Sequence, residues 1–132
     1  MKEVKWFMKR AQYLIIAGSI MLFCTAFLHA SGYSGVANAI AATGAKPFLV
    51  SAVKGLWLMF SAHLIILSLV FVVASRNSGG KWTVLACTLM PVFDTLLLLR
   101  FVGVFPGSIL LAIATVLFLI GGLLFPRSVN GT

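Results

Sequence analysis

The stretch LVSAVKGLWLMFSAHLIILSLVFVVA, residues 49–74, is 26 residues long and contains a single charged side chain, that of Lys54. A bilayer core of about 30 Å is crossed by roughly 20 helical residues, because an α-helix rises about 1.5 Å per residue. This stretch is therefore long enough to span a membrane. Similar apolar stretches occupy residues 13–30, 82–99 and 108–125. We expect all of these spans to be α-helices.

The composition of the whole chain agrees with a membrane protein. Of its 132 residues, 61% are hydrophobic and only 9% are charged, and the mean hydropathy is +1.13, which is unlike a soluble domain. The connections at residues 75–81 and 100–107 are short, so consecutive helices should be antiparallel neighbours. We predict an all-α, polytopic membrane protein that forms one antiparallel bundle of four transmembrane helices over residues 1–132.

The connection between the first two spans, residues 31–48, is longer and is rich in Gly, Ala and Ser. Its middle, residues 36–43, has a helical composition, and Gly44 and Pro47 beyond it are typical of a helix end. We expect a short interfacial helix on the outer membrane surface, which serves either as a simple covering connection or as a lid over a cavity.

The distribution of Lys and Arg predicts the orientation, because cytoplasmic flanks carry the excess of these residues. The basic residues on the side of the two termini are Lys2, Lys5, Lys9, Arg10, Arg76, Lys81 and Arg127. The other side has only Lys46 and Arg100, with Lys54 just inside a span. We therefore expect both termini to be cytoplasmic, in a membrane that the compact topology suggests is a bacterial inner membrane.

The net charge of +8 has a similar explanation. The charges are divided among short flanking segments, which favours contact with membrane lipids and argues against nucleic-acid binding.

Asp94 is one of only two acidic residues and lies inside the third expected span. An ionisable group in a membrane is costly, so it indicates a functional site and requires a partner. Counting inward from the outer ends of the spans at about 1.5 Å per residue places Lys54 about 7 Å deep and Asp94 about 9 Å deep. We predict that Lys54 pairs with Asp94, either in a functional site or as a structural ion pair that fixes helix register.

The same depth count places His29, Trp57 and Arg100 near this pair. Trp57 and Ser61 also lie on the same helix face as Lys54. We predict a polar pocket in the outer leaflet, with Asp94 and His29 as candidate catalytic residues. The predicted ligand contacts are Lys54, Trp57, Ser61, His63 and Arg100.

His63 differs from the other members of this set, because it is predicted to lie about 21 Å from the outer surface. It is also on the opposite face of its helix from Lys54. Its expected neighbours are Ser19 and Thr88, so it is either a packing residue that bonds a hydroxyl or a proton relay or ligand contact.

The sequence offers no metal, cofactor or disulfide motif. The two histidines are at different depths, and no ligand spacing typical of a metal site occurs. Cys24 and Cys87 also differ in predicted depth, which argues against a disulfide. We predict neither a metal nor a cofactor.

Three functions are compatible with these observations. In the first, the protein binds a lipophilic or amphiphilic small molecule in the outer-leaflet pocket, and in an enzymatic form of this hypothesis Asp94 acts as acid and base. In the second, it is an accessory or assembly subunit of a larger membrane complex. In the third, it is a proton- or ion-coupled transporter that works as a homo-oligomer, since four helices leave little room for a pathway.

Overall fold

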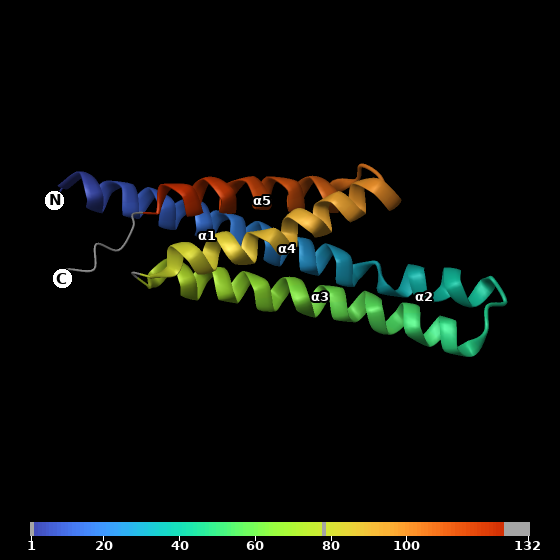
Figure 1. Ribbon diagram of the computed structural model, residues 1–132. Helices are drawn as coiled ribbons and strands as arrows, with labels where there is room; N and C mark the ends of the chain where they lie inside the picture. Colours follow the sequence, from blue (N-terminus) through green and yellow to red (C-terminus); the bar gives the residue numbers. More distant parts are fainter. Residues whose placement is uncertain (1, 78, 126–132) are drawn as a thin grey trace.

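The computed structural model describes residues 2–77 and 79–125, and in this part of the chain all regular secondary structure is helical (Figure 1). Four of the helices are long and apolar enough to cross a membrane. This confirms the predicted all-α four-helix membrane bundle. The helices in chain order are α1 (Lys2–Ser31), α2 (Tyr33–Ala42), α3 (Pro47–Arg76), α4 (Gly80–Phe101) and α5 (Pro106–Leu124).

The same local pattern, Gly-x-x-Pro, precedes both α3 and α5. Gly44 and Gly103 have φ angles of +69° and +94°, a conformation that favours glycine because it has no Cβ. Pro47 and Pro106 then occupy the first turn of the following helix, where a missing N–H costs nothing. Each glycine reverses the chain and each proline begins the next helix.

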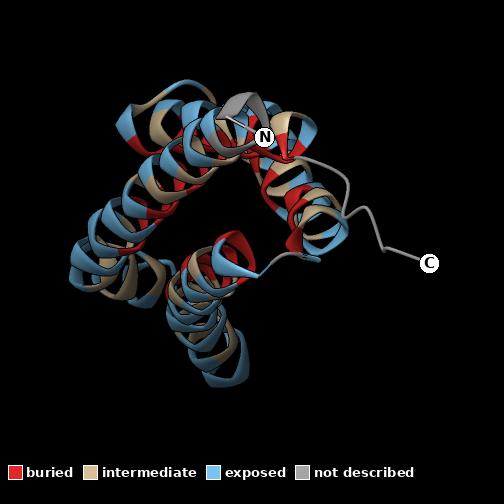
Figure 2. Ribbon diagram, turned by 90° about the vertical axis from the view of Figure 1, so that its left-hand side faces the viewer, coloured by how far each residue is buried: buried red, intermediate tan, exposed pale blue. Residues whose placement is uncertain are grey.

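The four long helices form a ring in which α1 packs against α3 and α5, and α4 packs against α5 and α3. Figure 2, a view along the bundle, shows the buried residues on the inner faces of the helices and the exposed residues on the outer faces. The contact between α3 and α4 is the least extensive of the four contacts around the ring, whereas that between α1 and α5 is the most extensive.

Glycines allow α1 and α5 to approach closely. A Cβ added at Gly18 would lie 2.9 Å from the Phe118 ring, and one added at Gly121 would lie 2.7 Å from the Ile15 side chain. Phe118 in turn stacks on Phe71 of α3, with ring centroids 3.6 Å apart. Both rings are fully buried, so this stack forms the centre of the core.

The α2 helix continues in the direction of α1, and residues Trp6–Ala42 form one apolar segment of 37 residues. Together with the first turns of α3, α2 extends beyond the ends of α4 and α5 (Figure 1). None of its residues is buried. The predicted short helix is thus present and begins at Tyr33, but it follows the bundle axis and does not cross over the end of the bundle.

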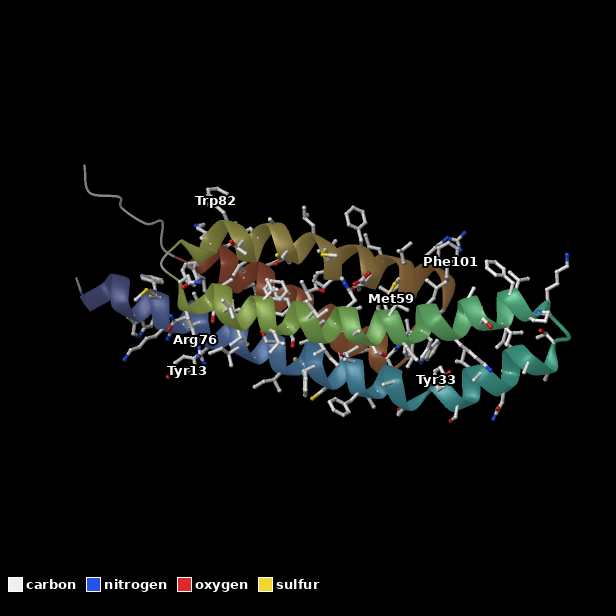
Figure 3. The ribbon with its side chains drawn as sticks, turned by 90° about the horizontal axis from the view of Figure 1, so that it is seen from below. Tyr13, Tyr33, Met59, Arg76, Trp82 and Phe101 are labelled. Carbon is white, nitrogen blue, oxygen red and sulfur yellow. The ribbon has the colours of Figure 1, made fainter. Side chains whose placement is uncertain are left out.

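The two ends of the bundle are marked by different residues. Tyr13, Arg76 and Trp82 lie at the end that carries the α3–α4 turn, which we call the turn end, whereas Tyr33 and Phe101 lie toward the other, the α2 end (Figure 3). On α4, the distance from Lys81 to Arg100 is about 28 Å at 1.5 Å per residue, close to the thickness of a bilayer core. These two residues therefore mark the expected limits of the apolar layer.

Candidate functional site

The α3–α4 turn determines which residues of the two helices meet. In antiparallel helices, residues at equal distances from the turn lie at the same level, and His63 and Asp94 both lie about 20 Å from this turn. Their side chains are in contact, with His63 Nε2 and Asp94 Oδ2 3.3 Å apart. His63 is therefore the partner of Asp94.

The predicted pairing of Asp94 with Lys54 is wrong, since no Lys or Arg among the described residues is within ion-pair distance of Asp94. The prediction counted depth from the outer ends of the helices, but α3 extends beyond α4 at that end (Figure 1). Measured from the turn, Lys54 lies about 12 Å closer to the α2 end than Asp94 does.

The predicted hydrogen bond from His63 to Ser19 or Thr88 is not formed, because His63 contacts Asp94 instead. The hydroxyls of Ser19 and Thr88 donate to carbonyl oxygens of their own helices, those of Ile15 and Val84, at 2.8 and 2.6 Å. Both hydroxyls therefore make the back-bonds that are common for Ser and Thr within helices.

The His63–Asp94 pair leaves one carboxylate oxygen incompletely satisfied. Asp94 Oδ2 is buried and accepts no regular hydrogen bond within the described part of the chain. His63 Nε2 is close to it, but hydrogen bonds also require a favourable direction. A buried polar atom without a donor is costly, so this oxygen is suited to accept a hydrogen bond from a ligand.

The pair lines an open groove of about 660 Å³ between α3 and α4, which we call the α3–α4 cavity. Met59 lies on the side of α3 that faces α4 (Figure 3). Methionine and aromatic side chains make this lining apolar and adaptable, and the volume is typical of small-molecule sites. The lining residues are Leu56, Met59, Phe60, His63, Met90, Phe93 and Asp94.

A second polar cluster joins α1 to α3. His29 Nδ1 lies 2.9 Å from Ser61 Oγ, and the Trp57 indole Nε1 donates to the His29 backbone carbonyl at 2.7 Å. The His29 and Trp57 rings stack, with centroids 3.9 Å apart and an angle of 17° between their planes. The structure thus brings together three residues that the sequence analysis assigned to one pocket.

His29 and Trp57, but not Ser61, line a cavity of about 370 Å³, which we call the His29 cavity. It lies between α1, α3 and α4 and is bounded by the α4–α5 connection. Its lining residues are Thr25, Leu28, His29, Gly32, Trp57, Phe60, Leu98, Val102, Phe105, Pro106 and Gly107.

Phe60 lines both cavities. Its ring centroid is 4.8 Å from that of His29 and 6.2 Å from that of His63. The single predicted pocket is therefore divided into two neighbouring cavities, with Phe60 between them. The sequence analysis did not identify Phe60, although it is one helical turn from both Trp57 and His63.

Lys54 and Arg100, which were predicted as ligand contacts, line neither cavity. The Arg100 guanidinium instead lies over the ring of its neighbour Phe101, 5.5 Å from the centroid. Cys24 and Cys87 are free thiols. Across residues 6–77 and 79–125, no three His, Cys, Asp or Glu side chains converge in a way that would hold a metal ion.

The fold and these cavities define an all-α, multi-pass membrane protein with polar groups placed between its helices. No protein family, no curated protein and no solved structure matches the chain.

Proposed function

We propose that the protein binds a lipophilic or amphiphilic molecule in the α3–α4 cavity, with Asp94 and His63 holding its polar group. The observation that carries this proposal is the buried Asp94 Oδ2, which has no regular donor and lines a cavity of about 660 Å³. A hydrogen-bond donor on the ligand would satisfy this oxygen, while the apolar lining would accept the rest of the molecule.

The position of the cavity suits entry from the membrane. The α3–α4 contact is the least extensive around the ring, and two of the lining side chains, Met59 and Phe93, are 62% and 63% exposed. With both termini in the cytoplasm, as the distribution of basic residues favours, Asp94 would lie about 9 Å below Arg100 in the outer half of the bilayer.

The pair also has the groups needed for proton transfer. A carboxylate and an imidazole in contact can exchange a proton, and both can act as acid or base toward a bound polar group. If the ligand is also a substrate, Asp94 is the acid/base candidate, and His63 takes the supporting role that the sequence analysis assigned to Lys54.

Native mass spectrometry of the protein extracted gently from its own membrane tests the proposal, with identification of bound molecules by lipidomics. We expect one class of small-molecule adduct on the wild type, which is lost in Asp94→Asn. Cys24→Ala is the control, because Cys24 is exposed on α1 and lines neither cavity. This control should retain the adduct.

Two outcomes would contradict the proposal: no adduct on the wild type, or an adduct that Asp94→Asn retains. A second polypeptide at fixed stoichiometry in place of an adduct would instead support an accessory subunit. The thermal unfolding of Asp94→Asn must be measured in parallel, so that loss of the adduct is not confused with loss of the fold.

A further inference from the structure

We propose that the His29 cavity is a second binding site, separate from the α3–α4 cavity, and that it takes a neutral lipophilic molecule with a hydroxyl group. The hydroxyl would bond to Nε2 of His29, and the apolar part of the molecule would fill the remaining cavity of about 370 Å³. That volume is within the range of small-molecule sites.

The first step of the argument is the orientation of the His29 ring. Ser61 Oγ donates to the Trp57 carbonyl at 3.3 Å, so its one hydrogen is already used. We assign the proton of the neutral His29 ring to Nδ1, because Ser61 can then keep its bond to Trp57 and accept the 2.9 Å contact from His29. A neutral imidazole with its proton on Nδ1 presents Nε2 as an acceptor, and Nε2 has no partner among the described residues.

Thr25 adds a second acceptor to the same cavity. It lies one helical turn before His29 on α1, so the two side chains share a face. Its hydroxyl donates to the Met21 carbonyl at 2.8 Å, which leaves only its oxygen lone pairs for a ligand. Since both groups accept, the ligand must donate, as a hydroxyl does.

The rest of the lining predicts that the ligand is neutral. Apart from His29, no lining residue of this cavity carries an ionisable side chain, and most are apolar or glycine. A charged head group would therefore be placed in an apolar site without a counter-charge, which is costly. Trp57, stacked on His29, forms one wall and provides a spectroscopic reporter.

Fluorescence quenching of Trp57 in nanodiscs of dioleoylphosphatidylcholine tests this assignment. The protein carries Trp6→Phe and Trp82→Phe, so that Trp57 is the only tryptophan. The three probes are 2-bromo-1-undecanol, 2-bromoundecanoic acid and 2-bromoundecane. Each carries its bromine beside the end that would lie near Trp57, since bromine quenches tryptophan on contact. We expect saturable quenching by the alcohol, with an apparent affinity about fivefold or more above those of the other two, as one hydrogen bond would give.

Variants separate recognition of the hydroxyl from simple partition into the membrane. His29→Leu should abolish the preference for the alcohol, and Val102→Phe should reduce its binding by filling the cavity while leaving His29 in place. Leu119→Phe, on α5 and outside both cavities, is the control and should leave binding unchanged. A protein with Trp82 as its only tryptophan should show no saturable quenching, because Trp82 is 66% exposed at the turn end.

The assignment is overturned if the acid binds as tightly as the alcohol, if the three probes quench equally, or if none gives saturable quenching. It is also overturned if a folded His29→Leu protein keeps its preference for the alcohol. Asp94→Asn should leave this quenching intact, so failure of the α3–α4 proposal and failure of this one are distinguishable.

Discussion

The α1–α5 contact and the α3–α4 contact differ in their extent and in the side chains that form them. Glycines at the α1–α5 contact place the backbones close together, and 44% of the apolar window of α5 is buried, compared with 22% for α4. Between α3 and α4 there are instead Met, Phe and Leu side chains around a carboxylate and an imidazole. The first contact is therefore the closely packed one, and the second is the one at which we propose that a ligand binds.

The properties of the bilayer explain how one bundle can contain both a closely packed contact and a loose one. Lipid tails are as apolar as leucine side chains, so helices associate through close packing and hydrogen bonds and not through the hydrophobic effect. A contact that lacks close packing is therefore held weakly, which leaves room for a lipophilic molecule. The α3–α4 turn and the α1–α5 contact keep the ring together while the other side of the bundle stays accessible.

The largest effect on stability is expected from Phe118→Ala. This change removes one member of the fully buried Phe71–Phe118 stack and should cost roughly 3 kcal/mol, since the cavity left behind cannot fully collapse. Phe93→Ala is the matched control, because Phe93 is 63% exposed on α4. Unfolding in mixed detergent micelles measures both, and equal losses would show that the stack is not the centre of the core.

An increase in side-chain size at the α1–α5 contact should have the next largest effect. Gly121→Leu would force a side chain against Ile15 and should cost about 1–3 kcal/mol, as overpacking does. Gly55→Leu is the control, since a Cβ there meets nothing within 4 Å. The same unfolding assay compares them, and a well-folded Gly121→Leu protein would contradict the close approach of α1 and α5.

A smaller effect, the coupling energy between two residues, tests whether His63 or Lys54 is the partner of Asp94. A double-mutant cycle of His63→Asn and Asp94→Asn should give a coupling energy of about 1 kcal/mol, because the stability changes of mutations at two residues in contact do not add. The cycle of Lys54→Met and Asp94→Asn should give less than about 0.3 kcal/mol, as expected for distant residues. If the cycle with Lys54 gave the larger coupling energy, Lys54 and not His63 would be the partner of Asp94.

The smallest effect is expected from Trp57→Phe, which removes the indole donor to the His29 carbonyl. Hydrogen bonds between membrane helices average about 0.6 kcal/mol, so the loss of stability should be of this size. Trp82→Phe, at an exposed position on α4, should change stability by less. If the two variants lose equal stability, the bond from Trp57 does not hold α1 to α3.

The sequence predicts the helices well because their signals are local. Apolar length identifies the four spans, and Gly44 and Pro47 indicate where the short helix between the first two spans ends. The structure starts α3 and α4 two residues before the expected positions 49 and 82. The first helix begins at Lys2, well before the expected residue 13, because its basic first turns are also compatible with a helix.

The candidate site was predicted only in part, because which of its residues meet depends on how far neighbouring helices are shifted along each other. Trp57 and Ser61 were grouped because they share a face of one helix, and His29 was grouped with them by its predicted depth. The structure brings these three together. The partner of Asp94 depends on where α3 ends relative to α4. Counting from the facing ends of α3 and α4, at Arg76 and Gly80, would have selected His63, whereas counting from the unequal outer ends selected Lys54.

Site-specific photo-cross-linking tests the central claim that the α3–α4 contact, unlike the rest of the outer surface, holds a specific molecule. p-Benzoylphenylalanine is placed at Phe93 or at Phe27, which are 63% and 62% exposed, and only Phe93 lines a cavity. After irradiation in native membranes, we predict one captured molecular class at position 93, lost in Asp94→Asn, and a mixture of bulk lipids at position 27. The same mixture of lipids at both positions would contradict the account.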